Sequence, residues 1–526
     1  MIETIRKDES FMKNENRVAL VDIGSNTVRL VIFSYDQFYN VSELQNIKVP
    51  ARLASYINED SEMTREGIDK LTKILINFKR VVMRFDVENT IYVATAAVRQ
   101  SKNVKAIEKE VKKKLDLDMQ VLSEDQEAFY GNYAVRHTMD FKKGVTVDIG
   151  GGSTEVVLFT QDRRLETVSL PFGAVTLKEK FFEESSHNNT KAIKKACKFI
   201  RQQLETLDWL VDSEVSIIGI GGSVRNIGEV HQRANDYPIA GIHGYRMSVK
   251  DIEETLQIFT SRTMSDLDDL DGLSKERKDT IIPANIVFQQ ILEVAESENL
   301  YISNNGLREG YIIEYLNEKY NTPYGLSNIK AQQIARIARK YKVSSYAVNQ
   351  RFIIADELVR ELEKNKILTL SQKELKIMYY GCVLYYLGAY IENSGWSQHT
   401  FYIISNISLA GFNQKERITI ALIASFKNKS LFNQYTEDFK SWFTSVELER
   451  ILYLGGIVKF AEALNDSQVN IVENIQIDPT DSGDYNLTVN YAGSLIAEEY
   501  RANKQKNHIQ RFIDGDLHIT FNDHVK

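Results

Sequence analysis

Two short segments share one arrangement of an aspartate, glycines and hydroxyl side chains. VALVDIGSNTVRLVIF spans Val18–Phe33, and VTVDIGGGSTEVVLF spans Val145–Phe159 and has two more glycines. In each segment a β-branched run ends in Asp-Ile-Gly, and a second apolar run follows a small polar turn, which predicts a β-hairpin. Asp22 and Asp148 are 126 residues apart. The chain is therefore predicted to hold two copies of one unit.

The residue types in both hairpins suit the binding of phosphate. Glycine has no Cβ, so it permits positive φ and lets backbone N–H groups approach phosphate oxygens, while Ser and Thr hydroxyls add donors. A carboxylate repels phosphate, so the aspartate that ends the strand is expected to hold a cation or to orient a water. A single hairpin of this kind is usually only a tight turn. The repeat favours two facing hairpins that clamp an anion across a cleft.

A third glycine-rich segment, SIIGIGGSVRNIG, spans Ser216–Gly228. It predicts a buried strand, a Gly-Gly-Ser turn and a helix that opens at Val224 or Arg225. The N–H groups at a helix start suit an anion or the ribose-phosphate part of a nucleotide. The same pattern also begins many α/β crossovers, so a purely structural turn is the alternative.

Two more segments supply a cation and a carboxylate. Arg99 follows the apolar run of Ile91–Gln100 and could fork onto a phosphate or lie at the surface. Ser123 and Gln126 form a capping-box pattern, which predicts a helix start. Glu127 then lies in the first turn, where a carboxylate stabilises the helix dipole. It could also orient and deprotonate a water for phosphoryl transfer.

Six motifs follow one another over residues 17–310: VDIGSNT, ATAAVRQ, SEDQEA, VDIGGGSTE, GIGGS and SNNGLREG. Together they resemble the exopolyphosphatase / guanosine pentaphosphate phosphohydrolase (Ppx/GppA) family of the actin, sugar-kinase and heat-shock ATPase superfamily. The resemblance implies an α/β fold with two ribonuclease-H-like domains and a mainly helical C-terminal region that is similar to a degenerate HD domain. It also implies a homodimer.

The resemblance assigns roles to matching residues. Glu127 matches the catalytic glutamate, Asp148 the carboxylate associated with Mg²⁺ or Mn²⁺, and Arg99 a phosphate-contacting arginine. Glu155 is expected to assist the metal, and Asp22 completes the predicted catalytic set. The other predicted substrate-binding residues belong to the three glycine-rich turns: Gly24, Ser25, Asn26, Gly150, Gly151, Gly152, Ser153, Thr154, Gly221, Gly222 and Ser223.

The chain departs from the family pattern in two places. Where the family usually has Ser-Gly-x-Glu-Glu-Ala, Ser123–Ala128 reads SEDQEA, which loses the glycine and the first glutamate but keeps Glu127. The segment Leu273–Asn285 keeps the family's arginine, aspartate and proline, but Ala284 replaces a usual glycine. Activity is expected, with substrate preference left open.

The C-terminal half lacks the metal ligands of the HD-type domain that it resembles. Tyr385 and Tyr386 replace the metal-binding dipeptide, Tyr346 stands where an earlier ligand histidine would be, and His399 remains alone. We expect no second metal-dependent site here, but a platform for binding and dimerisation. Its basic start, Ser327–Lys342, has five cations and no acid and could extend the path of a phosphate chain or simply be a solvated face.

The order of the expected strands and helices predicts four domains, at residues 15–138, 139–322, 323–464 and 465–526. A hydrophobic content of 43% with 26% charged residues is typical of soluble globular proteins. No apolar run approaches the roughly 18 residues of a membrane helix, and the first residues lack a secretory signal pattern. We therefore expect a cytoplasmic protein. Nothing in the sequence, including its net charge of −7, argues for nucleic-acid binding or membrane association.

The function predicted from these observations is exopolyphosphatase, with inorganic polyphosphate as substrate and orthophosphate as product. One alternative is hydrolysis of the 5′-phosphate of guanosine pentaphosphate, with guanosine penta- and tetraphosphate as ligands. Others are a kinase of the same superfamily, and a non-catalytic sensor of polyphosphate or alarmones.

Overall fold

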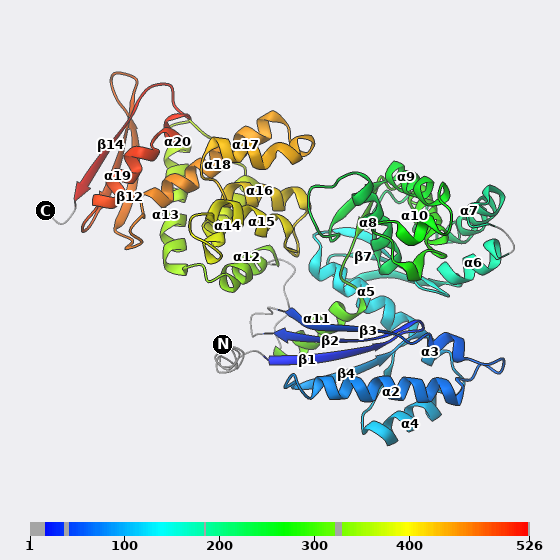
Figure 1. Ribbon diagram of the computed structural model, residues 1–526. Helices are drawn as coiled ribbons and strands as arrows, with labels where there is room; N and C mark the ends of the chain where they lie inside the picture. Colours follow the sequence, from blue (N-terminus) through cyan, green and yellow to red (C-terminus); the bar gives the residue numbers. More distant parts are fainter. Residues whose placement is uncertain (1–15, 36–40, 184–185, 321–328, 524–526) are drawn as a thin grey trace. The chain divides into compact units, whose positions relative to one another are not determined.

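A computed structural model describes residues 16–35, 41–183, 186–320 and 329–523 (Figure 1). The chain divides into two compact units: the first comprises Met1–Asp236 and Ile242–Ser327, and the second comprises Tyr237–Gly241 and Asn328–Lys526. The finer division into four parts stays a prediction. Within the described ranges, no helix combines the length and apolar character needed to cross a membrane.

The first sheet of the first unit has the order β3-β2-β1-β4-β5. Strands β1 and β2 pair antiparallel, whereas β4 runs parallel to both β1 and β5. Its strands are β1 (Asn16–Ile23), β2 (Thr27–Tyr35), β3 (Ser42–Pro50), β4 (Asn89–Ala94) and β5 (Gln120–Val121).

Helices α2 (Arg65–Val82) and α4 (Val104–Leu115) cover one face of this sheet (Figure 1). Helix α2 begins where the Thr64 side chain accepts a hydrogen bond from the Gly67 N–H. Its buried residues recur at helical spacing, so one apolar stripe faces the sheet: Ile68, Leu71, Leu75, Phe78 and Val82.

The second sheet has the order β10-β11-β9-β6-β7-β8. The inner strands β6 and β9 pair in parallel and are almost wholly buried, as expected for strands covered on both faces. The strands are β6 (Lys143–Ile149), β7 (Thr154–Thr160), β8 (Arg164–Leu170), β9 (Ser216–Ile220), β10 (Tyr245–Ser248) and β11 (Asn299–Ile302). The helices of this domain are α6 (Ala174–Phe182), α7 (Thr190–Leu204), α8 (Gly222–Ala234), α9 (Val249–Thr260) and α10 (Ile281–Val294).

Helices α5 (Glu124–Thr138) and α11 (Leu307–Tyr320) pack on each other and connect the two sheets. In α11, Ile312 and Leu316 join the apolar cluster on the first sheet, so this helix returns to the first domain. In α5, Val135 packs with buried residues of the second sheet. A Cβ at Gly310 would clash with the Tyr130 carbonyl, so glycine permits this close crossing.

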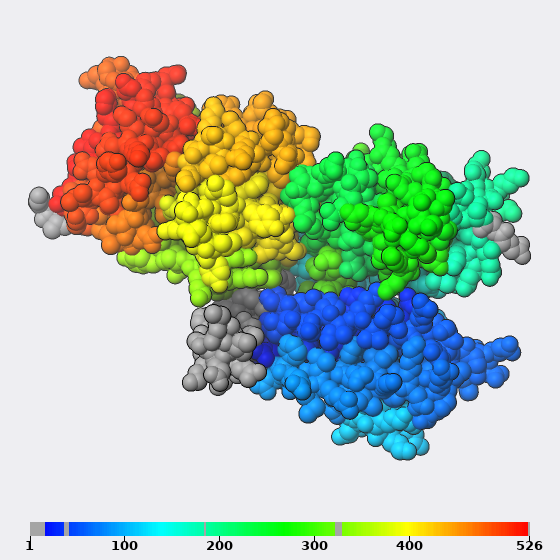
Figure 2. All heavy atoms as spheres, in the orientation of Figure 1, coloured from blue at the N-terminus to red at the C-terminus, as the bar shows by residue number. Residues whose placement is uncertain are grey.

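The second unit is helical up to Ala463 and then forms the sheet β12-β13-β14, and both regions share one apolar core. Figure 2 shows the helical residues (yellow and orange) and the C-terminal residues (red) as one continuous surface. The helices are α12 (Ile329–Lys340), α13 (Ser345–Lys364), α14 (Gln372–Leu384), α15 (Trp396–Asn406), α16 (Gln414–Ala424), α17 (Lys429–Thr436) and α18 (Ser445–Ala463). The last elements are β12 (Val472–Pro479), β13 (Tyr485–Tyr491), α19 (Ile496–Gln505), α20 (Asn507–Gln510) and β14 (Leu517–Asp523).

The tyrosine pair that replaces the HD dipeptide lies beside a buried ion pair. Arg351 pairs with Glu462 and donates a hydrogen bond to the Cys382 carbonyl oxygen at 2.7 Å. The same guanidinium lies 5.3 Å from the ring centre of Tyr385, whose hydroxyl donates to the Phe426 carbonyl. These groups fill the interior with arginine and tyrosine, neither of which is a usual ligand for a divalent metal. Of the predicted basic segment, Ser327 lies outside the described residues.

Candidate active site

The first hairpin presents Asp22 beside a braced turn. The Gly24 N–H donates to the Thr27 carbonyl at 3.0 Å, which closes the turn between β1 and β2. The carbonyls of Ser25 and Asn26 accept hydrogen bonds from the backbone of residues 51–54. Asp22 pairs across the hairpin with Arg29. Hydrogen bonds from residues 51–54, which lie outside the hairpin, therefore fix the conformation of the turn.

The second hairpin repeats this geometry residue for residue. The Gly150 N–H donates to the Ser153 carbonyl at 2.9 Å, and Asp148 pairs across the hairpin with Glu155. Both turns therefore have the same length, and the two additional glycines, Gly151 and Gly152, replace Ser25 and Asn26 rather than lengthening the turn. The carbonyls of Gly150 and Gly151 accept from the start of α6, while the exposed amides of Gly151 and Gly152 have no partner among the described residues. Such amides are available to an anion.

The glycines of the two hairpin turns do not use the positive φ that glycine permits. Among the described glycines, the left-handed region is occupied in the third turn, at Gly221 (φ 92°), and not at the glycines of the hairpins. There, a Cβ would stand 2.5 Å from the Asp148 Oδ1 atom, so glycine lets this carboxylate lie against the backbone. In the two hairpin turns, the absence of a glycine side chain instead leaves the backbone N–H groups accessible to a ligand.

The third turn ends where α8 starts at Gly222, two residues before the earlier of the two predicted positions. A side chain at Gly222 would clash with the Arg277 guanidinium, which donates to the Ser223 hydroxyl at 3.0 Å. Asp148 and Arg277 therefore both lie against the backbone of this turn. A carboxylate and a guanidinium side by side could bind a cation and an anion.

Arg99 contacts Glu127. Its guanidinium donates to a Glu127 carboxylate oxygen at 3.0 Å and to the Leu122 carbonyl at 2.9 Å. The capping box of Ser123 and Gln126 forms as predicted, and it starts α5 so that Glu127 lies in the first turn. Arg99 therefore orients the glutamate, and its predicted contact with phosphate stays a prediction.

Four arginines surround the two aspartates, and the predicted site contained none of them. Arg308 approaches Asp22 to 3.8 Å, and Arg225 donates to the Gly221 carbonyl at 3.0 Å. Burial, together with the charges of the neighbouring arginines, lowers the pKa of Arg29, Arg225 and Arg277. Arg29 could have been found from the hairpin register, because it is the partner of Asp22. The approach of Arg308 depends on the return of α11 and has no local signal.

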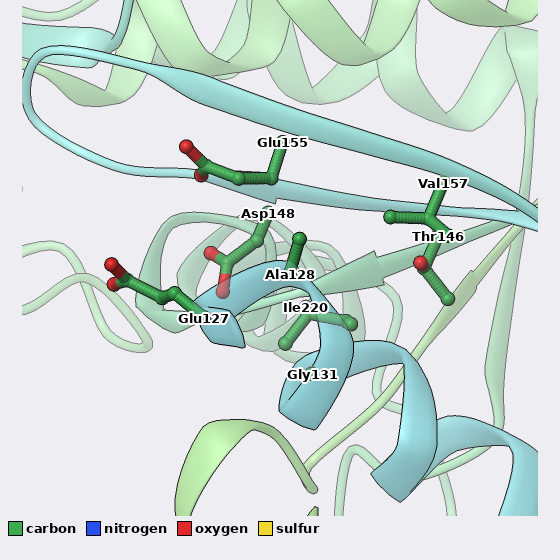
Figure 3. Close-up of a pocket in the computed structure, with 8 residues that line it drawn as sticks. All are labelled: Glu127, Ala128, Gly131, Thr146, Asp148, Glu155, Val157 and Ile220. Atoms are coloured by element: carbon green, nitrogen blue, oxygen red, sulfur yellow. The ribbon is translucent and has the colours of Figure 1, made fainter. Parts of the chain in front are cut away.

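Three carboxylates line a small cavity: Glu127 from α5, Asp148 from β6 and Glu155 from β7 (Figure 3). They project on the same side of the pocket, with Thr146 and Val157 farther inside. The cavity has about 10 Å³ for the centre of a water molecule, close to the room that one water needs. Its lining can position a single water beside acidic groups.

The protein environment disfavours negative charge on these groups. Burial raises the pKa of Glu127 to about 7, against the opposing effect of Arg99. Burial and the charge of Glu155 raise the pKa of Asp148 to about 6. Burial also raises the pKa of Glu155, whose carboxylate accepts hydrogen bonds from Ser153 and Ser169. A cation between Asp148 and Glu155 would relieve this repulsion, so the two carboxylates fit a hard divalent ion.

Residues 31–319 match the model of the Ppx/GppA phosphatase family, and residues 329–502 match that of Ppx/GppA phosphatase domain III. The chain belongs to the Ppx/GppA phosphatase family. This confirms the family predicted from the six motifs.

Similar proteins cover different shares of this phosphatase. A Pseudoalteromonas translucida protein named guanosine-5′-triphosphate,3′-diphosphate pyrophosphatase is 24% identical over 459 residues, which are 86% of this chain and 87% of that one. A bifunctional 3-dehydroquinate synthase/phosphatase of Fusobacterium nucleatum is 27% identical over 319 residues, and the match spans 58% of this chain and 48% of that protein.

Solved structures agree with the fold. The Aquifex aeolicus Ppx/GppA family member is 26% identical with a TM-score of 0.53, and the match covers 58% of this chain and 99% of that one. An exopolyphosphatase from Cytophaga hutchinsonii is 21% identical with a TM-score of 0.52, and the match covers 58% of this chain and 98% of that one. This match supports the fold alone. The predicted fold class, two α/β domains of the actin-like type with a helical region, is confirmed.

Proposed function

We propose that this Ppx/GppA phosphatase hydrolyses the terminal phosphoanhydride bond of inorganic polyphosphate and releases orthophosphate. The observation that carries the proposal is the water-sized cavity lined by Glu127, Asp148 and Glu155, next to a glycine-rich turn with unpartnered amides. Attack by water needs a base, a cation near the phosphate and donors for its oxygens. The described residues supply the base, the ligands for the cation and the donors.

Glu127 acts as the general base. A carboxylate with a pKa near 7 is largely ionised just above neutral pH, yet basic enough to accept a proton from water in the transition state. Arg99 holds its carboxylate in place. The water proton passes to Glu127, a bond forms from the water oxygen to the terminal phosphorus, and the bridging bond to the shortened chain breaks.

Asp148 and Glu155 would hold Mg²⁺ or Mn²⁺. When bound, that ion offsets the negative charge of the phosphate oxygens. The amides of Gly151 and Gly152 bind the same oxygens from the protein side. In the facing turn, Gly24 to Asn26, the amides of Ser25 and Asn26 are proposed to do so from the opposite side, because the Gly24 N–H already closes the turn. Ser153 and Thr154 keep the second hairpin in register, since their side chains bond Glu155 and the Phe172 carbonyl.

The arginines and the third turn are proposed to bind the rest of the phosphate chain. Arg29, Arg225, Arg277 and Arg308 lie around Asp22 and Asp148, and guanidinium groups bind phosphate oxygens well, so these four cations support binding of a polyanion. Gly222 and Ser223 contribute by holding Arg277 at the start of α8, and Gly221 contributes by leaving room for Asp148.

The second candidate is hydrolysis of the 5′-terminal phosphate of guanosine pentaphosphate. The observation that favours it is the match to the Pseudoalteromonas protein, which carries that name and aligns over 86% of this chain. The terminal anhydride is the same in both substrates, so the proposed chemistry does not change. A homodimer remains an expectation from the family resemblance, and a cytoplasmic location remains an expectation from the composition and the missing membrane and signal patterns.

One assay separates these functions. Orthophosphate release is measured with long-chain polyphosphate, guanosine pentaphosphate and ATP in the presence of Mg²⁺, with Glu127→Ala as the blank. Fastest release from polyphosphate supports the first proposal, and fastest release from guanosine pentaphosphate replaces it with the second. Release from none of the three contradicts both and leaves a sensor, while ATP consumption that depends on an added acceptor indicates a kinase.

A further inference from the structure

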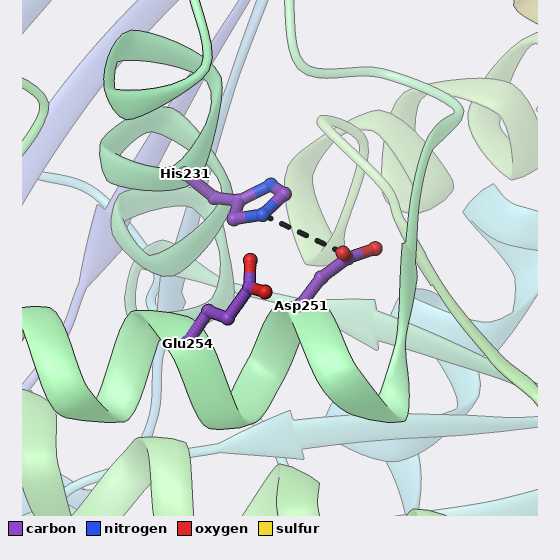
Figure 4. Close-up of side chains that lie close together, drawn as sticks. All are labelled: His231, Asp251 and Glu254. Carbon is purple, nitrogen blue, oxygen red and sulfur yellow. Dashed lines mark ion pairs between the residues drawn. The ribbon is translucent and has the colours of Figure 1, made fainter.

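A histidine and two carboxylates converge away from the active site, between α8 and α9. His231 lies in the last turn of α8, and Asp251 and Glu254 lie one turn apart at the start of α9 (Figure 4). One ligand atom from each lies within 4.8 Å of the others. Across the ranges that the structure describes, no other group of three or more His, Cys, Asp or Glu residues meets this distance.

One ring nitrogen of His231 is buried without a partner. The side chain is only 8% exposed, and Nδ1 lies 2.8 Å from the Tyr245 hydroxyl oxygen. The Nε2 atom forms no hydrogen bond and lies 3.7 Å from the Asp251 Oδ1 atom, too far for one. A buried polar atom left without a hydrogen bond is destabilising, so this nitrogen is available to a ligand.

The protonation of the ring suits a ligand at Nε2. When Nδ1–H donates to the Tyr245 hydroxyl, the lone pair is on Nε2 and points toward the carboxylates (Figure 4). A hydrogen bond to the other ring nitrogen is how metal-bound histidines are usually oriented.

Both carboxylates keep an oxygen available. Asp251 uses Oδ2 to accept the Ser248 N–H at 2.7 Å in the capping box of α9, which leaves Oδ1 facing His231. Glu254 lies 3.3 Å from the Lys250 ammonium, but that lysine side chain is 81% exposed, so the pair is weak.

We propose that His231, Asp251 and Glu254 bind a first-row divalent metal of the Zn²⁺ or Mn²⁺ type. Imidazole favours these ions over Mg²⁺ and Ca²⁺, which prefer oxygen ligands alone. Ligand atoms around a tetrahedral Zn²⁺ ion lie roughly 3.4 Å apart, close to the separation of Nε2 and Oδ1. Water completes the coordination on the exposed side.

The site ties the end of α8 to the start of α9. His231 is six residues beyond Arg225, or roughly 9 Å along the helix, so the ion does not touch the reacting phosphate. Its effect is on the stability of the second α/β domain. The proposal is independent of the proposed function.

The test measures Zn²⁺ binding to the full chain by calorimetry, with excess Mg²⁺ to occupy the active site. Wild type and the control Glu253→Gln, an exposed neighbour on α9, are expected to bind one Zn²⁺ and to melt at a higher temperature with it. His231→Ala and Glu254→Gln are expected to weaken this binding at least roughly tenfold and to lose the thermal shift. Asp251 is not substituted, because it also caps α9.

X-ray absorption at the zinc edge identifies the ligands. Asp148 and Glu155 offer only oxygen, so an imidazole signal that disappears in His231→Ala reports this site. The proposal is overturned if wild type binds no Zn²⁺, if the bound ion shows no imidazole, or if both variants bind it as wild type does.

Discussion

The two hairpins of the active site share a backbone and differ in charge. Both turns close with the same hydrogen bond, from Gly24 to Thr27 and from Gly150 to Ser153. At the position across from the aspartate, however, the first hairpin has Arg29 and the second has Glu155.

That one exchange separates the roles of the hairpins. Asp22 is flanked by Arg29 and Arg308, both of which act to lower its pKa against the larger effect of burial. Asp148 faces Glu155, which adds to the effect of burial and raises its pKa further. We therefore propose that a duplicated unit has a cation site at the second hairpin only, while the first hairpin contributes cations toward the phosphate.

The largest expected effect is loss of the acidic groups beside the cavity. Glu127→Ala and Asp148→Ala are expected to lower kcat about 100- to 10,000-fold, because they remove the base and a metal ligand. Asp125→Ala, in the same helical turn but paired with Arg164, is the control and should keep kcat. Turnover is followed by phosphate release and folding by circular dichroism. Near wild-type turnover in either alanine variant would remove that residue from the mechanism.

Substitutions at the paired position should separate metal binding from substrate binding. Glu155→Gln is expected to raise the Mg²⁺ concentration for half-maximal rate roughly tenfold or more, with recovery at high Mg²⁺. Arg29→Gln is expected to raise KM for the phosphate substrate with little change in Mg²⁺ dependence. Titrations of Mg²⁺ and of substrate measure the two effects. Equal responses from both variants would show that the hairpins do not divide these roles.

The pH profile tests Glu127 as the base. The ionised form is active, so kcat is expected to fall about tenfold per pH unit as the pH drops below about 7. Arg99→Gln removes a cation that lowers the pKa of Glu127, so the fall in kcat should begin at a higher pH. The check is kcat against pH at saturating Mg²⁺. A flat profile from pH 5 to 8 would exclude a titrating base of this kind.

The smallest expected effect is on stability. The pKa of Asp148 is about 6 in the folded protein against 3.8 as the ordinary value, so the folded state holds the proton more tightly. The free energy of unfolding therefore falls as pH rises from about 4 to 6, by about 1.4 kcal/mol per pKa unit of difference. Above about pH 6 the Asp148 carboxylate is charged, and the free energy of unfolding is lowered by the full cost of burying that charge.

Without Mg²⁺, Asp148→Asn should thus raise Tm at pH 8 by a few degrees, and the gain should vanish near pH 4. Asp162→Asn, exposed in the turn between β7 and β8, serves as control. A Tm gain that does not depend on pH would point to packing rather than charge.

Local sequence determined the parts of this site that depend on neighbours in the chain. The hairpins follow from β-branched runs around short polar turns, and the start of α5 follows from Ser123 and Gln126, because hydrogen bonds between residues three apart need no distant partner. The Ppx/GppA motifs identified the family for the same reason, since each is a short stretch of backbone and side chain that carries its own chemistry.

Tertiary structure decided the contacts between residues that are far apart in the sequence. Arg308 reaches Asp22 only because α11 returns across the first sheet. Arg99 turns toward Glu127 because the segment after β4 lies beside the start of α5. His231 meets Asp251 through the packing of α8 on α9. Burial, which sets the pKa of each carboxylate in the cavity, is a property of the whole packed domain, and no local pattern encodes it.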